Sequence, residues 1–397
     1  MIIPVEFVLF GVTLVGVALS HDRTLEVAAT GLAAILCWKL GVLDFDGVPG
    51  LAGLAQHVRG EWVVLANLFG LLMGFALLSR HFEASRVPDL LPDLLPDDWR
   101  GGLVLLLLVF VLSAFLDNIA AALIGGTVAS HVYRHKVHIG FLAAIVAAAN
   151  AGGAGSVVGD TTTTMMWIDG VAPSEVVHAY VASVAALLVF GIPASMQQQR
   201  YSPIVKRADV RIHADWVRVG VVVFILAMAV TCNVVVNVEF PELAARFPFI
   251  GVAVWVALLV AAPLRVPDWK VLPGMLRGTM FLLCLVFSAS LMPVEKLPAA
   301  SWPTALGLGF VSAVFDNIPL TKLALEQRGY DWGVLAYAVG FGGSMVWFGS
   351  SAGVAITTVF PQARSVGLWL RSGWHIALGY VVGFAVLLLT LGWRPHP

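Results

Sequence analysis

The sequence predicts an all-α polytopic membrane protein built from two inverted repeats. Each repeat is expected to have five transmembrane helices, one of them broken, plus a re-entrant hairpin. The first observation is composition: of 397 residues, 59% are hydrophobic and 12% charged, whereas soluble domains carry about 25% charged residues. The second is a repeated pattern, since an Asp-Asn pair between two short apolar runs occurs at Asp117-Asn118 and again at Asp316-Asn317. Matching ionisable residues at membrane depth indicate internal repeats with a functional site.

In the first half, apolar runs predict three spans, near 3–20, 25–42 and 62–79, followed by a polar, proline-rich stretch. Shorter apolar runs at 102–116 and 119–130 flank Asp117-Asn118. A full span needs about 20 residues, so these runs predict a re-entrant hairpin. Residues 138–168 are apolar but interrupted by Gly152-Gly153 and Gly159, which predicts a broken helix, and 175–197 closes the half.

The second half repeats this order. Spans are expected near 216–237, 249–264 and 276–292, and a hairpin near 303–315 and 318–328. A broken helix follows at 333–360, and a last span at 372–393. The breaks are expected at glycines that match those of the first half, namely Gly342, Gly343 and Gly349.

Charge bias predicts the orientation. The loop 199–218 carries five basic residues, Arg200, Lys206, Arg207, Arg211 and Arg218, and basic loops face the cytoplasm. Both termini are then expected outside the cytoplasm. The protein itself is expected in the cell (inner) membrane. The second half enters from the opposite side, so the first hairpin opens to the cytoplasm and the second to the exterior.

Several features limit the function classes. The net charge of −1 gives no reason to expect nucleic acid as a partner. The three cysteines lie in apolar segments at wide spacings and predict core residues, not a metal motif. The N-terminus lacks a basic n-region, so we expect a retained first span and no cleaved signal.

The residues beside the first break predict a cation site. Non-helical backbone at membrane depth survives only where protein buries it or water lines it, so the breaks predict a central cavity. Near the first break lie four oxygen-bearing side chains, Asn150, Ser156, Asp160 and Thr161. Carboxylate, amide and hydroxyl oxygens suit a hard cation such as sodium.

The intramembrane acids favour a cation over an anion. Asp117, Asp160 and Asp316 are the clearest carboxylates, and only Lys322 is near the second hairpin tip. Such acids can hold protons or a metal cation, and that competition is itself an exchange mechanism.

Structural alternatives stay open. Each of the three Asp residues could cap the helix that follows it. Gly152-Gly153 could mark a close helix crossing, and Lys322 could neutralise Asp316. His375, in the last span, could relay protons or be a satisfied buried histidine.

These residues resemble a known family. The run 150–167 resembles the signature of NhaD-type sodium/proton antiporters, in the ion transporter superfamily, and 113–118, 312–319 and 342–354 resemble its other motifs. The resemblance implies exchange of sodium or lithium for protons, an elevator-like mechanism and a homodimer. Site roles carry over to Asp117, Asn150 and Asp160 as sodium ligands, then to Asn118 and Thr161. The sequence departs from the family at Gly155, which usually is tryptophan, and Val157, which usually is proline.

The resemblance also implies four chain segments. Residues 1–99 would be scaffold helices of repeat 1 and 100–200 its transport part, while 201–295 and 296–397 would be the scaffold and transport part of repeat 2. With Asp316 and Asn317 in the second hairpin, the cation and proton site would be completed from both repeats. The cation chemistry is expected to centre on the first copy, because Ser350 stands where the first copy has Asp160.

Two other functions compete. A sodium-coupled carboxylate or oxyanion transporter of the same superfamily would tend to carry Ser-Asn-Thr at its hairpin tips, whereas both tips here read Asp-Asn-Ile. An intramembrane aspartyl protease would need a second glycine at the position of Val157. We therefore expect a secondary transporter, not an enzyme, with sodium as substrate and no cofactor.

Overall fold

Within the residues that the structure describes, the regular structure is helical apart from one short strand pair. In the computed structural model, the described residues are 4–20, 23–42, 44–45, 48–87, 90, 95–204, 213–244, 246–315 and 317–396. Strands β1 (Asp44–Phe45) and β2 (Val48–Pro49) pair antiparallel between the second and third helices.

The helices follow the predicted order, and each run expected to be helical contains at least one helix. The first half contains α1 (Val5–Leu19), α2 (Thr24–Val42), α3 (Gly50–Ala84), α4 (Trp99–Ser113), α5 (Asn118–Val132), α6 (Ile139–Gly153), α7 (Thr161–Ile168), α8 (Pro173–Val177) and α9 (Ala179–Tyr201). The second half contains α10 (Trp216–Glu239), α11 (Pro241–Ala244), α12 (Phe249–Ala261), α13 (Leu272–Ser290), α14 (Trp302–Ser312), α15 (Asn317–Gln327), α16 (Trp332–Gly342), α17 (Ser351–Val359), α18 (Val366–Ser372) and α19 (Trp374–Leu391), with 3-10 turns η3 (Trp269–Val271), η4 (Val294–Lys296) and η5 (Pro361–Ala363).

The third helix is longer than its apolar run predicts. Helix α3 has 35 residues and begins at Gly50, whereas the expected span was 62–79. Its first turns carry polar residues such as Gln56 and Arg59. Hydropathy finds the part of a helix that suits hydrocarbon, but helical hydrogen bonding continues into the polar part.

The helix lengths fit a multi-pass membrane protein. Five helical segments of the described chain are long and apolar enough to cross a bilayer, namely Thr24–Val42, Gly50–Ala84, Pro173–Tyr201, Trp269–Ser290 and Trp374–Leu391. Helices α4, α5, α6 and α16 are apolar but shorter. At 1.5 Å per residue, the 15 residues of α4 span about 22 Å, less than the roughly 30 Å of hydrocarbon.

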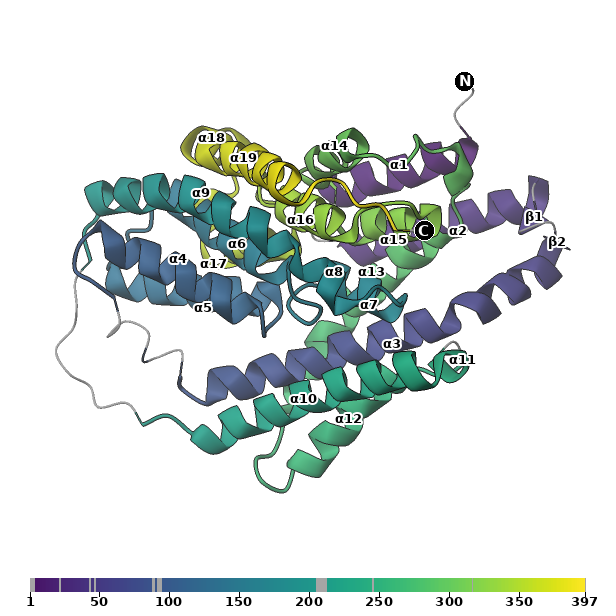
Figure 1. Cartoon of the computed structure of the whole chain (residues 1–397), viewed down its shortest axis with the longest axis horizontal. Coiled ribbons are helices and arrows are strands. Elements are labelled where there is room, and N and C mark those ends of the chain that lie inside the picture. The colour runs from purple at the N-terminus through teal and green to yellow at the C-terminus, as the bar shows by residue number, and fades with distance from the viewer. Residues whose placement is uncertain are drawn as a thin grey trace.

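The helices pack in two groups, which we call the support helices and the core helices. The support helices are α1, α2, α3, α10, α12 and α13, among which α3 packs against α10, α12 and α13 (Figure 1). The core helices are α4 to α9 and α14 to α19, in which α9 packs against α19, α6 and α4. The groups meet where α13 packs on α15 and where α3 packs on α7.

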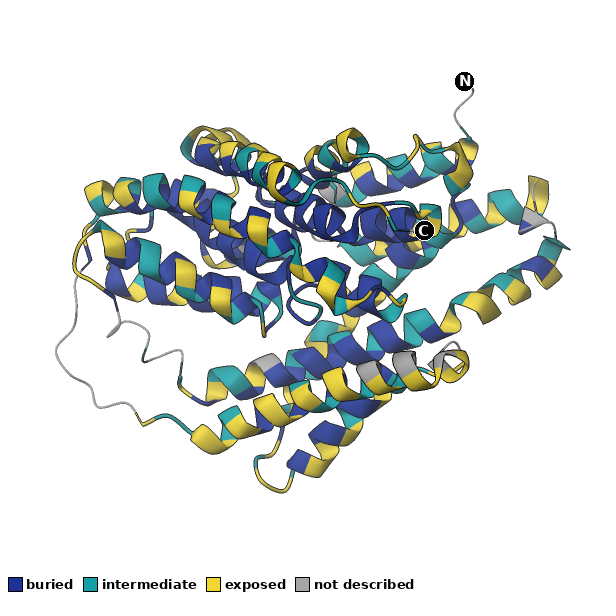
Figure 2. Cartoon of the chain, in the orientation of Figure 1, coloured by how far each residue is buried: buried dark blue, intermediate teal, exposed yellow. Residues whose placement is uncertain are grey.

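Two core helices have no polar face. Every residue of α6 from Gly140 to Gly153 is buried, as is every residue of α16 from Trp332 to Gly342 (Figure 2). A helix that is apolar all round must be surrounded by other helices. The two helices that end at the glycine breaks therefore lie at the centre of the core group.

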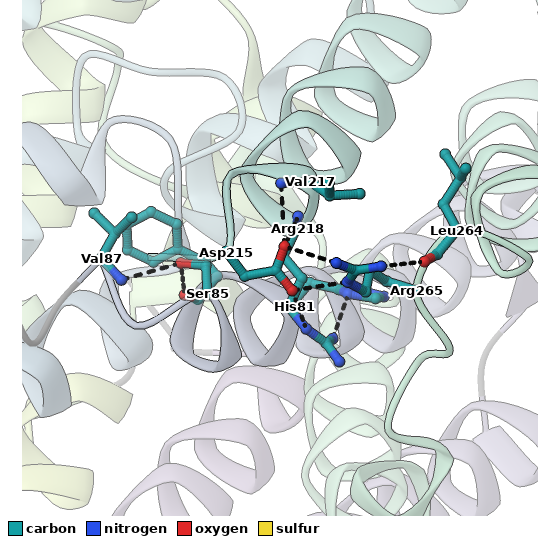
Figure 3. Close-up of polar contacts among 9 residues, drawn as sticks. His81, Ser85, Val87, Asp215, Val217, Arg218, Leu264 and Arg265 are labelled. Carbon is teal, nitrogen blue, oxygen red and sulfur yellow. Dashed lines mark hydrogen bonds and ion pairs between the residues drawn. The ribbon is translucent and has the colours of Figure 1, made fainter. Parts of the chain in front are cut away.

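A polar junction joins the ends of three support helices (Figure 3). The Asp215 carboxylate caps α10, accepting from the Val217 amide at 3.2 Å, and also accepts from Arg265 Nε at 2.7 Å. Arg218 on α10 donates to His81 Nδ1 on α3 at 3.1 Å. The hydrogen bond from Arg265 lowers the pKa of Asp215, and the amides at the start of α10 lower it further.

Candidate functional site

Close backbone contacts hold each helix break against the last turns of a preceding short helix, α4 for the first break and α14 for the second. A Cβ on Gly152 would collide with the carbonyl of Phe110 in α4, and one on Gly342 with the carbonyl of Gly309 in α14. Gly159 likewise faces the Ser113 carbonyl. Only glycine permits such approaches, so these residues are required by packing.

The matching positions of the second half repeat the arrangement. Gly349 faces the Ala313 carbonyl, as Gly159 faces that of Ser113. Gly153 lies against Gly159, and Gly343 lies against Gly349. All six glycines predicted to break the helices therefore lie at close contacts. The close-crossing alternative and the break interpretation are compatible, because the close contacts lie where α6 and α16 end.

The first break is held together by its threonines. Asp160 caps α7 and accepts from the Thr162 amide at 3.2 Å. Thr163 Oγ1 donates to the Ser156 carbonyl at 2.5 Å, and Thr164 Oγ1 donates to the Val157 carbonyl at 2.9 Å. These bonds satisfy carbonyls that the interrupted helix leaves without amide partners.

The Asp160 side chain faces the second half of the molecule. It is only 3% exposed, and its Oδ2 lies 3.5 Å from Asn317 Nδ2, at the start of α15. A Cβ built on Gly340 of α16 would lie 3.2 Å from the same oxygen. The Asp160 carboxylate of the first break thus lies against two helices of the second half, α15 and α16.

Asn150 links the two breaks to the start of α5. Its Oδ1 accepts from Asn118 Nδ2 at 3.1 Å. Its Nδ2 donates to Ser344 Oγ and to Ser350 Oγ, each at 3.0 Å. The side chain is fully buried, so these bonds offset the cost of removing its amide from water.

A cavity of about 320 Å³ lies between the core and support helices. Its polar wall comes from the core helices and contains Asp117, Asn118, Asp160, Thr161, Thr164, Asn317, Ser350 and Ser351. Its apolar wall comes mainly from α1, α3 and α13 and contains Leu14, Val17, Leu68, Leu71, Leu72, Phe75, Phe281, Leu282 and Leu285. No described lysine, arginine or histidine lines it, so its charge is negative when the acids are ionised.

Comparison with known proteins finds relatives that are named sodium/proton antiporters. No family model matches the chain. It is 26% identical over 430 residues to sodium/proton antiporter 1 of Arabidopsis thaliana, an alignment that covers 96% of this chain and 71% of the relative. It is 27% identical over 321 residues to the Na(+)/H(+) antiporter NhaD of Vibrio parahaemolyticus, covering 69% of this chain and 77% of that protein. The chain is a relative of the NhaD-type antiporters.

The relationship holds along most of the chain. Sodium/proton antiporter 2 of Arabidopsis thaliana is 24% identical over 424 residues, covering 97% of this chain and 96% of its own. The names of these relatives indicate a transporter, not an enzyme, and the helices are those of a multi-pass membrane protein.

Most predicted site residues of this NhaD relative lie together. Asp117, Asn118, Asp160, Thr161 and Asn317 line the cavity, and Asn150 lies behind them through its bond to Asn118. Asp117 also caps α5 by accepting from the Ile119 amide at 3.3 Å. Capping and facing the cavity occur together in both acids, so the capping alternative does not exclude ion binding. The prediction for Asp316 concerns a residue outside the described ranges.

Ser156 has a different position. Its hydroxyl donates to the Ala114 carbonyl at 2.6 Å, at the turn between α4 and α5. It is not among the residues that line the cavity. In this structure its side chain joins the first break to the first hairpin tip.

Sequence reasoning missed two groups near the site. Ser344 holds Asn150, yet a serine beside a glycine pair carries no signal of its partner. Glu61, on α3, lies 2.9 Å from Lys322 Nζ, and Glu326 Oε1 lies 2.6 Å from the same nitrogen. Glu61 escaped notice because it precedes the apolar run expected at 62–79.

Proposed function

We propose that this chain exchanges sodium or lithium for protons across a cell membrane. The supporting observation is that Asp117 and Asp160 line one cavity with amide and hydroxyl oxygens and without a described cationic side chain. Two carboxylates that share a cavity repel each other, so a cation or protons must compensate their charge. Sodium and protons would therefore compete for the same oxygens.

In this proposal sodium binds Asp117 and Asp160, with Asn118, Thr161 and Asn317 close by. Asn150 lies behind, where it fixes Asn118 and Ser350 through its amide. A proton on either acid would remove the charge that holds the cation.

The architecture that we propose is the inverted repeat. Helices α4 and α5 would form the first re-entrant hairpin and α14 and α15 the second, since each is too short to cross the bilayer. Segments 1–99 and 201–295 would supply the scaffold, and 100–200 and 296–397 the transport part. The packing of support and core helices supports this division. Movement of the core group against the support group would give elevator-like alternating access.

The basic loop 199–218 supports an orientation with both termini outside, in the inner membrane. We further propose a homodimer, in which the support helices of two copies meet. Cross-linking of the full chain in native membranes would test this, because a chain that yields only single-copy bands would contradict it.

Proton movement in everted vesicles tests the exchange. Added sodium should alkalinise vesicles that contain the chain, and D117N and D160N should abolish this. Asparagine still caps helices, so a loss in either variant reports the charge.

The matched control is D331N. Asp331 is buried and caps α16 by accepting from the Val334 amide at 3.0 Å, but it does not line the cavity. Full exchange in D117N and D160N would refute the site. Citrate uptake driven by sodium, without proton movement, would instead favour the carboxylate transporter.

A further inference from the structure

A buried ion pair joins a support helix to a core helix. Lys322 of α15 has a side chain that is 4% exposed, and its Nζ lies 2.9 Å from Glu61 Oε2 of α3, whose side chain is 16% exposed. A charge this deeply buried requires a partner. The support-helix side chains that line the cavity are mainly apolar, so this pair is a specific polar connection between parts that the proposed mechanism separates.

The pair lies beyond one end of the cavity. On α3 the cavity is lined by residues from Leu68 to Phe75, and Glu61 precedes Leu68 by about two turns, or roughly 10 Å. On α15 the cavity is lined by Asn317 and Ile318, and Lys322 lies about one turn further along. Both partners are therefore displaced from the cavity in the same direction.

The cavity extends toward the other side of the molecule. It reaches Val17 near the end of α1, Thr24 at the start of α2 and Met275 near the start of α13. The end of α1, the start of α2 and the end of α3 share one side, because successive helices run in opposite directions. With the proposed orientation this is the cytoplasmic side, and Glu61 and Lys322 lie toward the exterior.

We propose that the Glu61–Lys322 ion pair is the contact that closes the cavity on the exterior side. It must break each time the core helices move to expose the site there. This inference rests on the proposed two-part mechanism, to which it adds two positioning residues that lie outside the ion site.

A second acid makes the separation feasible. Glu326 lies one turn after Lys322 on the same helix, 2.6 Å from Nζ, and residues four apart face each other. It would travel with Lys322 and keep a counter-charge beside it. On the same moving part, Arg328 pairs with Asp169 at 2.7 Å, so the core group balances its own charges when Glu61 is left behind.

The test compares the two acids that share Lys322. In a chain whose Cys37, Cys232 and Cys284 are replaced by alanine, V354C places a thiol in the cavity wall. A membrane-impermeant maleimide is then applied to right-side-out or everted vesicles. E61Q should raise exterior labelling relative to cytoplasmic labelling by on the order of tenfold, because losing one ion pair shifts the population of the two states.

E326Q is the matched control, since it removes a partner of Lys322 without touching the link to α3. Its labelling ratio should remain within about twofold of the parent. Equal ratios in E61Q and E326Q, whether raised or unchanged, would overturn the proposal. Labelling of V354C reports access to the cavity and does not require ion exchange. A negative labelling result can therefore be distinguished from a failure of the proposed antiport.

A reversible cross-link covers the case in which E61Q does not fold. Oxidation of E61C/K322C in the same cysteine-free background should fix the chain with the exterior side closed. Exterior labelling of V354C should then fall to background and return on reduction. Exterior labelling that persists in the cross-linked protein would overturn the proposal.

Discussion

The two helix breaks share a backbone arrangement and differ in charge. In both, the first glycine of a pair packs against a backbone carbonyl of the preceding short helix, and a polar side chain caps the second half-helix. In the first break that cap is Asp160, and in the second it is Ser350, which accepts from the Gly353 amide at 3.3 Å. Both breaks therefore have the same backbone geometry, whereas among the described residues only the first break carries a capping carboxylate.

The breaks are also joined to each other. Asp160 of the first lies against Asn317 of the second hairpin, and Asn150 of the first donates to Ser344 and Ser350 of the second. Side chains of the second half therefore share the polar wall of the cavity with the acids of the first, namely Asn317, Ser350 and Ser351.

The largest difference in exchange rate between the two breaks should come from replacing their capping residues, Asp160 and Ser350. D160N should reduce sodium-driven proton movement by more than about 100-fold, as expected when one buried charge is removed from an ion site. S350A removes one of the two acceptors of the Asn150 amide and should cost roughly 1 kcal/mol of site stability, or about fivefold in exchange rate. Rates in everted vesicles at matched protein content measure both. Similar losses in the two variants would show that the breaks are chemically equivalent.

The next comparison concerns the shared geometry. G152A and G342A should each destabilise the protein by about 1–3 kcal/mol, because the new methyl group meets a backbone carbonyl in both halves. G307A is the control, since it lies in α14 with open space around it, and should be neutral or slightly stabilising. Thermal unfolding in detergent gives the values. A large loss in G152A alone would mean that the second break does not need its close contact.

The sequence was sufficient for features that depend on neighbouring residues. The helix ends at the glycines, the ends of α4 and α14, and the acids Asp117 and Asp160 stand in continuous apolar runs, where any polar or flexible residue is conspicuous. Partners across the molecule were not predictable: Asn150 meets Ser344, and Asp160 meets Asn317, only because α6, α7, α15 and α16 pack at one point.

Glu61 shows the other limit. Hydropathy marks where a helix enters hydrocarbon, and an acid just before that point is ordinarily solvated. Its pairing with Lys322 depends on the position of α3 relative to α15, which no local sequence pattern encodes.

The two asparagines at the hairpin tips should differ less than the caps. Asn118 donates to Asn150 at 3.1 Å, whereas Asn317 reaches Asp160 at the longer distance of 3.5 Å. N118A leaves the buried Asn150 oxygen without its donor and should slow exchange by about tenfold. N317A should chiefly weaken sodium affinity, by roughly threefold, because the lost bond is long. The sodium dependence of exchange separates the two effects, and an unchanged half-saturating sodium concentration in N317A would remove Asn317 from the site.

The smallest effect is expected for a capping acid outside both breaks, and it sets a baseline for Asp160. Asp215 caps α10 and pairs with Arg265 at 2.7 Å, with part of its side chain in solvent. Since Arg265 and the α10 amides lower its folded pKa, its stabilisation is present above the unfolded pKa of about 3.9 and is lost as the pH falls through the folded pKa. The unfolding temperature of the parent should therefore exceed that of D215N at pH 7, and the gap should close below about pH 4. Exchange at pH 7 should be unchanged in D215N, because Asp215 does not line the cavity. The absence of a gap at every pH would mean that the carboxylate contributes only the cap, which asparagine also supplies, and that a capping acid alone cannot account for a pH-dependent phenotype at Asp160.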